Sequence, residues 1–222
     1  MKININVPTS LSDIKLSQYQ KFIRTTKDSE DDNFIARQMV CIFCDLPDSV
    51  VGSIKANQYD DLVKDISEVL QQKGTFKSTF KMNSVEYGFI PNLDDITVDE
   101  KADLDTFYKD VQTLDKAMGV LYRPITVKTK RGYLIEDYTD EYLGQSLDVT
   151  LDIVFGANVF FSNLTKDLLN YIQRFTVEQV ERNPKALQIL AQNGVGITAF
   201  TNSLEEMFYD LNKLVNLNYT QH

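Results

Sequence analysis

The chain has 222 residues, of which 43% are hydrophobic and 25% charged, and its formal net charge is -9. This composition is typical of a globular protein, and it excludes a disordered polar tail, a collagen-like chain and a disulfide-dense secreted scaffold. The excess of acidic residues disfavours binding of free duplex DNA unless the basic residues gather on one face.

The first zone, residues 1–74, predicts a short strand followed by helices. Residues 1–8 alternate apolar and polar side chains, which is typical of a strand and of neither a signal peptide nor a transit peptide. Beyond them, apolar residues recur at helical spacing in three segments: 16–23, 34–43 and 57–73. We expect Asn57 to cap the third helix and Gly74 to end it.

The second zone, residues 75–135, begins with a hairpin signal. Residues 75–81 and 85–90 alternate apolar and polar side chains on either side of Asn83-Ser84. Thr97 and Glu100 then have the spacing of a capping box, which predicts the start of a helix. The apolar positions that follow continue this helix for about 24 residues, so the zone contains a long central helix.

A second hairpin follows the central helix in the same zone. Pro124 is expected to end the helix, because proline cannot continue it. Residues 125–130 and 133–135 then read as two strands around a turn at Arg131-Gly132. The zone is therefore predicted as two β-hairpins bracketing a long helix.

The third zone, residues 136–222, reads as helical from about Ser146 to the end. Interruptions are expected at three places: Ser162-Asn163, Asn183-Pro184 and the glycine loop 194–196. The most apolar stretch, 151–161, covers about half of the roughly 20 residues that span a bilayer, so we expect a soluble chain without a membrane segment. The fold class predicted for the whole is α+β and mostly helical, in a single compact domain over residues 1–222.

The residue types leave little room for catalysis. The only histidine is the last residue, His222, so no internal imidazole is present for a Ser/His/Asp triad, a Cys/His dyad or a histidine-ligated metal. Cys41 and Cys44 have C-x-x-C spacing, but they come late in an apolar helix, which favours buried core cysteines over a redox pair. We predict no catalytic, cofactor-binding or metal residue. A C-x-x-C redox function is the alternative, and it requires both thiols to be exposed and at least one of them to have a depressed pKa.

Two acidic segments could in principle bind a cation. Residues 28–32 lack the central glycine and the distal glutamate of a calcium loop. The other segment holds six carboxylates: Asp94, Asp95, Asp99, Glu100, Asp103 and Asp105. Both segments lie where helices are predicted to begin, and the helix dipole favours negative charge there. A helix start is the preferred interpretation, and an acidic rim follows if the carboxylates face outward together.

Candidate interaction residues come from three places. Lys128, Lys130 and Arg131 form the basic cluster at the tip of the second hairpin, where a solvated turn, an acidic partner or nucleic acid would each suit them. Phe160 and Phe161 are adjacent, so on a helix they point about 100° apart and one of them is free to face a partner. The last predicted helix carries Met207 and Phe208 on an apolar stripe that suits either the core or a partner.

Two segments carry a resemblance to a known family. Residues 87–97 read YGFIPNLDDIT and residues 114–125 read LDKAMGVLYRPI. Their order resembles a family of small morphogenesis proteins of tailed bacteriophages, in which an N-terminal strand and helix lead to a GFIP-L segment and then an LYRP segment. The composition, rich in Lys, Asn, Asp, Ile and Tyr, is similar to that of phages of Bacteroidetes hosts, including the crAss-like group.

This resemblance implies a virion protein, either a ring-forming head-tail connector or tail subunit, or alternatively a tail assembly chaperone that holds unassembled subunits. It implies as partners further copies of the chain and other phage structural proteins. The expected location is the neck or tail of the virion, after assembly in the host cytoplasm. An acidic ring suits a DNA conduit, because it repels the phosphate backbone and lets DNA slide past. Within the second motif, Arg123 is expected to reach either the last-turn carbonyls or an acidic neighbour.

Overall fold

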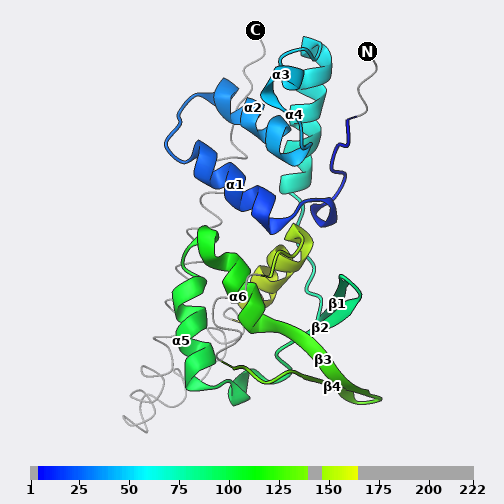
Figure 1. Cartoon of the computed structure of the whole chain (residues 1–222), viewed down its shortest axis with the longest axis vertical. Coiled ribbons are helices and arrows are strands. Elements are labelled where there is room, and N and C mark those ends of the chain that lie inside the picture. Colours follow the sequence, from blue (N-terminus) through cyan, green and yellow to red (C-terminus); the bar gives the residue numbers. More distant parts are fainter. Residues whose placement is uncertain (1–4, 140–146, 165–222) are drawn as a thin grey trace, which may run out of the picture.

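The computed structural model describes residues 5–139 and 147–164, and it has the α+β, mostly helical fold that the sequence predicts (Figure 1). The helices are α1 (Leu16–Thr26), α2 (Asp32–Phe43), α3 (Asp48–Val51), α4 (Ala56–Leu70), α5 (Val98–Phe107), α6 (Leu114–Leu121) and a segment at 151–164. Short 3-10 turns are η1 (Leu11–Asp13), η2 (Leu93–Asp95) and η3 (Val111–Thr113). The strands are β1 (Thr79–Met82), β2 (Val85–Phe89), β3 (Tyr122–Thr129) and β4 (Gly132–Ile135).

The first zone differs from its prediction at both ends. Residues 1–4 of the predicted strand lie outside the described residues. Residues 5–8 form no strand, although their side chains alternate, because no other described segment pairs with them. At the other end, α4 begins after Lys55 instead of Asn57 and ends at Leu70, before Gly74. Gly74 has a different role: a Cβ atom there would lie 2.3 Å from the backbone carbon of Phe155, so glycine lets the two backbones touch.

Both predicted hairpins are confirmed, and they join into one antiparallel sheet with the order β1-β2-β3-β4. Asn83 and Ser84 have φ angles of 49° and 68°, which matches the type I′ turn that connects twisted strands closely. The second turn lies at Lys130-Arg131, one residue earlier than predicted. Strand β2 pairs with β3, with Tyr87 opposite Pro124, so the two hairpins join through their inner strands.

The prediction of one long central helix is wrong, because this segment forms α5, η3 and α6 instead. Asp110 starts η3 by accepting a hydrogen bond from the N–H of Gln112, and the Thr113 hydroxyl donates to the carbonyl oxygen of Phe107 at 2.7 Å. These side-chain bonds replace the backbone ladder of a continuous helix. Pro124 does not end α6 either, since the helix stops at Leu121 and Pro124 lies inside β3. The Ile90 N–H donates to the Leu121 carbonyl at 2.9 Å, so the end of α6 bonds to the residue that follows β2.

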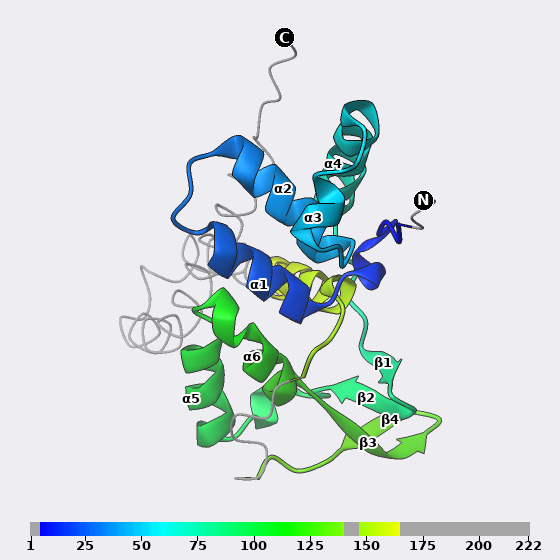
Figure 2. The same ribbon diagram turned by 45° about the horizontal axis from the view of Figure 1, so that its top comes forward.

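The helix at 151–164 lies between the α1–α4 layer and the layer of α5, α6 and the sheet, as the two views agree (Figures 1 and 2). It begins at Leu151, later than the predicted Ser146, and continues through Ser162-Asn163, where an interruption was expected. Its start is fixed by two backbone bonds, Leu16 N–H to the Val149 carbonyl at 2.8 Å and Leu151 N–H to the Ile14 carbonyl at 2.9 Å.

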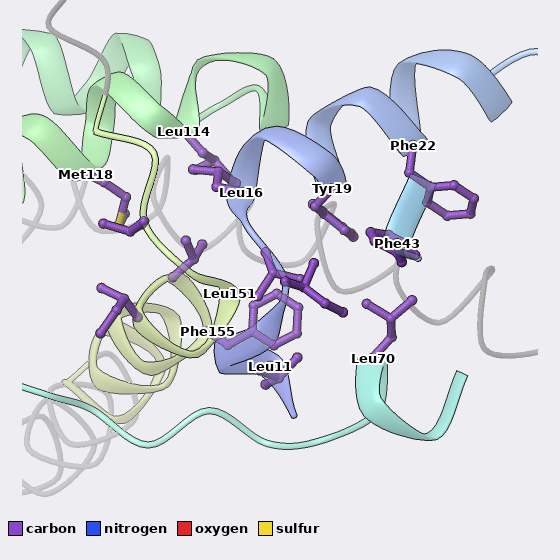
Figure 3. Packing of buried hydrophobic residues seen from close by; sticks show 14 of the residues in the cluster. Leu11, Leu16, Tyr19, Phe22, Phe43, Leu70, Leu114, Met118, Leu151 and Phe155 are labelled. Carbon is purple, nitrogen blue, oxygen red and sulfur yellow. The ribbon is translucent and has the colours of Figure 1, made fainter. Parts of the chain in front are cut away.

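One buried hydrophobic cluster joins these layers. Figure 3 shows Leu151 and Phe155 next to Tyr19 of α1, while Leu114 of α6 lies beside Leu16. The rings of Tyr19 and Phe155 meet edge to face with their centroids 6.4 Å apart. Segments from both ends of the described chain therefore close the same core, to which the predicted sub-regions 1–74, 75–135 and 136–222 all contribute side chains.

Candidate interaction surface on the β3–β4 hairpin

Strand β3 begins in the core and ends in solvent, and its exposed end forms the candidate surface. Its first residues, Tyr122 and Arg123, are buried, whereas residues 126–129 are exposed. In both views the β3–β4 hairpin extends beyond the rest of the sheet, with its turn at the edge of the molecule (Figures 1 and 2). The basic cluster predicted at a hairpin tip therefore lies on a projecting arm.

The outward face of this arm is apolar. Val127 and Leu134 are direct cross-strand partners, so their side chains lie on the same face of the sheet. They remain 47% and 60% exposed, which is high for aliphatic side chains. The opposite face is occupied, since the Tyr133 hydroxyl donates to the carbonyls of Ser78 at 3.0 Å and Phe89 at 2.9 Å. On the outward face, by contrast, no described residue covers Val127 and Leu134.

The three cations of the arm have different environments. The Lys128 ammonium lies 2.6 Å from the Glu86 carboxylate of the same chain, and its hydrogen bond holds the pKa of Glu86 below the usual range. Lys128 thus already has an acidic partner in its own chain. Lys130 and Arg131 form the exposed turn, and neither makes an ion pair with a described residue. These two cations lie in the turn beyond the apolar pair, and within the described part of the chain no carboxylate is matched with them.

The predicted phenylalanines lie elsewhere, in an aromatic cluster under the sheet. Phe160 stacks on Phe76 with the ring centroids 4.5 Å apart and meets Phe89 at 5.2 Å. Phe161 is buried beside Tyr108 and Phe89. Phe160 is half-buried, and its ring packs against the core, so the structure brings neither phenylalanine to the arm. Met207 and Phe208 lie outside the described residues.

A buried ion pair anchors the base of the arm. Arg123 Nη1 lies 2.6 Å from Glu100 Oε1, and both side chains are about 95% buried. The two charges meet without the alignment of a hydrogen bond, and the Arg123 Nε also has no hydrogen-bond partner among residues 5–139 and 147–164. The guanidinium lies over the Tyr138 ring, 5.6 Å from its centroid. The expectation that Arg123 reaches an acidic neighbour is confirmed, and that neighbour is the capping glutamate of α5.

The acidic segments begin helices, as predicted. Asp31 caps α2 by accepting from the N–H groups of Asn33 and Phe34. Thr97 and Glu100 form the capping box of α5, with the Thr97 N–H 2.6 Å from the Glu100 carboxylate. Because Glu100 is buried, the six carboxylates do not form one outward rim. Among the described residues no group of three or more His, Cys, Asp or Glu side chains is placed to hold a metal ion.

The surface at the start of α5 has a feature that sequence reasoning missed. Val98, in the first turn, is 83% exposed. The exposed carboxylates Asp94, Asp95 and Asp99 surround it in sequence, and none of them pairs with a cation among residues 5–139 and 147–164. A capping box predicts the helix start but not which way its first apolar residue points, so no local signal could have revealed this exposure.

The two cysteines lie at the end of α2, where they are poor candidates for redox chemistry. Cys44 is buried, and loss of solvent raises the pKa of its thiol to about 11. Cys41 is only half-buried, which corrects the prediction of two buried thiols, and burial followed by the charge of Asp48 raises its pKa. Both thiols are therefore protonated near neutral pH, whereas a reactive pair needs a depressed pKa.

In the described ranges 5–139 and 147–164, no helix is both long enough and apolar enough to cross a bilayer. No protein-family model, curated protein or solved structure matched this chain.

Proposed function

We propose that this chain is a structural protein of a tailed bacteriophage particle, a ring-forming subunit of the head-tail connector or tail. The observation that carries the proposal is the projecting β3–β4 arm, whose outward face presents Val127 and Leu134 and whose turn holds Lys130 and Arg131, cations with no ion pair among the described residues. An aliphatic pair next to an arginine has the composition of a protein-protein contact, in which a small buried core is bordered by polar groups.

The body of the protein supports this role by holding the arm rigidly. Arg123 and Glu100 fix the start of β3 inside the core. The Tyr133 hydroxyl ties β4 to the carbonyl just before β1 and to the carbonyl at the end of β2. A rigid arm loses little conformational entropy when it binds, so more of the contact energy remains for association. Interlocking arms of this kind suit a closed ring, in which each subunit uses two different surfaces.

The net charge of -9 supports a passive contact with DNA. A ring of acidic subunits repels phosphates and lets DNA pass without adhering. We further propose that the chain is not an enzyme. Burial raises the pKa of both thiols, which disfavours the C-x-x-C redox chemistry that was the remaining catalytic alternative.

The test combines the native mass with the composition of the particle. Multi-angle light scattering of the purified chain is expected to give a closed oligomer, and peptides of the chain are expected at stoichiometric levels in purified particles of the phage that encodes it. The double variant Val127→Ser/Leu134→Ser should lower the oligomer mass, whereas Val85→Ser, on the exposed start of β2, should leave it unchanged. A monomer that is absent from particles would contradict the proposal and favour a tail assembly chaperone.

A further inference from the structure

We propose that the β3–β4 arm of one copy docks onto the surface at the start of α5 of a second copy, so that copies join head to tail. This inference rests on the proposed function and names the partner of the arm. It commits both contact surfaces to this chain: Val127, Leu134, Lys130 and Arg131 on one copy, and Val98, Asp94 and Asp99 on the next.

The two surfaces are complementary in charge. The arm carries Lys130 and Arg131, which have no ion pair among the described residues. The start of α5 carries Asp94 and Asp99, which are also exposed and unpaired within that part of the chain. In contrast, Asp48, Asp148 and Asp152 of the same chain are each matched with a lysine or arginine. Opposite unmatched charges on two faces select for a contact between copies and against a contact of like faces.

The two surfaces are also complementary in their apolar content. Val98 is the most exposed of the large hydrophobic side chains in the described part of the chain, at 83%. Leu134 and Val127 of the arm follow at 60% and 47%. A contact that covers all three gains from the burial of aliphatic surface, while the charges form the solvated border.

The other acidic segment suits the arm less well. In residues 28–32, the Asp31 carboxylate is occupied by the N–H groups that it caps. The large hydrophobic side chain next to this segment is Phe34, which is only 37% exposed, whereas Val98 is 83% exposed. Asp28, Glu30 and Asp32 are exposed, so this segment matches the start of α5 in its carboxylates. Its apolar target is the smaller of the two, which favours the start of α5.

The position of the surfaces makes the contact intermolecular. In both views α5 lies on one side of the sheet and the hairpin turn on the other, so the arm points away from α5 of its own chain (Figures 1 and 2). Two different surfaces on opposite sides produce a heterologous contact, which propagates from copy to copy and closes into a ring when the rotation permits.

Charge reversal tests the pairing. One variant carries Lys130→Glu/Arg131→Glu and the other Asp94→Lys/Asp99→Lys; these positions are exposed, and their side chains make no ion pair among the described residues. Each variant alone is expected to self-associate at least about 100-fold more weakly, because like charges then face each other. An equimolar mixture is expected to assemble again, since every contact in an alternating assembly regains opposite charges.

Matched controls separate this pairing from a general effect of charge. Lys27→Glu/Lys55→Glu and Asp60→Lys/Asp61→Lys change the net charge by the same amounts at exposed sites away from both surfaces, and their assembly should match the unmodified chain. Circular dichroism confirms that each variant is folded. Sedimentation velocity measures the assembly of each variant and of the mixture.

The outcomes distinguish this inference from the proposed function. If the unmodified chain assembles but the reversals do not weaken it, or if the mixture stays dissociated, the pairing is wrong while the ring stands. If the unmodified chain stays monomeric at its highest attainable concentration, the head-to-tail pairing is overturned, and detection of the chain in purified particles then decides separately whether it is a structural protein.

Discussion

The two ends of strand β3 hold the same kind of ion pair in opposite surroundings. At the base, Arg123 and Glu100 lie 2.6 Å apart with side chains 6% and 5% exposed; at the tip, Lys128 and Glu86 lie 2.6 Å apart with side chains 59% and 29% exposed. Water screens the second pair and is excluded from the first. The comparison teaches that burial, and not contact distance, decides what each pair contributes: the base serves folding, and the tip is available for binding.

The largest expected effect comes from breaking the buried pair. Arg123→Ala leaves the Glu100 carboxylate buried without a cation, and the free energy of unfolding should fall by about 3–5 kcal/mol. Chemical denaturation measures this change. The double variant Arg123→Met/Glu100→Met, which leaves no lone charge, should recover most of the loss. A small effect of Arg123→Ala would show that the base is as well solvated as the tip.

The next effect comes from a backbone contact in the body. A Cβ atom on Gly156 would lie 2.4 Å from the Thr75 carbonyl oxygen. Gly156→Ala should therefore push the helix at 151–164 away from the segment that leads to β1, at a cost of about 1–3 kcal/mol. Gly52→Ala is the control, since the nearest atom there belongs to the flexible Arg37 side chain at 3.0 Å. Equal stability of the two variants would contradict the close backbone packing.

A smaller effect is expected where the base meets α5. Thr97→Ala removes the hydroxyl that accepts from the Glu100 N–H at 3.1 Å, and the unfolding free energy should fall by about 1 kcal/mol. Thr97→Ser keeps the hydroxyl and should restore stability. Thermal unfolding of the three chains gives the comparison, and an effect that is the same in both variants would rule out the cap as its cause.

The smallest effect is expected at the tip. Lys128→Ala should leave the midpoint of chemical denaturation unchanged within error at moderate salt, because exposed pairs contribute little. The hydrogen bond from Lys128 holds the pKa of Glu86 low, so that pKa should rise in the variant. An NMR titration of the Glu86 carboxyl measures it. A large loss of stability instead would place Lys128 in the structural core of the arm.

Local elements of this fold could be predicted from short stretches of sequence. The hairpin at 79–89 follows from alternating side chains around Asn83-Ser84, and the start of α5 follows from the spacing of Thr97 and Glu100. Both depend on bonds within a few residues, so the information needed is local. The acidic segments were interpreted correctly as helix starts for the same reason.

The candidate site could be predicted only in part. The cations Lys130 and Arg131 were expected at a hairpin tip and lie there. Their apolar companions Val127 and Leu134 were missed, because a strand that alternates has two faces and its sequence does not tell which one the core covers. Val98 was missed in the same way.

The sequence of this protein thus specified the capping box of α5, the Asn83-Ser84 turn and the charge balance, all of which depend on neighbouring residues. Tertiary contacts specified the rest: Ile90 bonded to Leu121 ends α6, Gly74 and Gly156 let two distant backbones touch, and the pairing of β2 with β3 turns one face of the arm inward. The reason is physical. Burial depends on which distant segment packs against a residue and excludes water, and the interaction energy of a charge or an apolar side chain depends in turn on that burial.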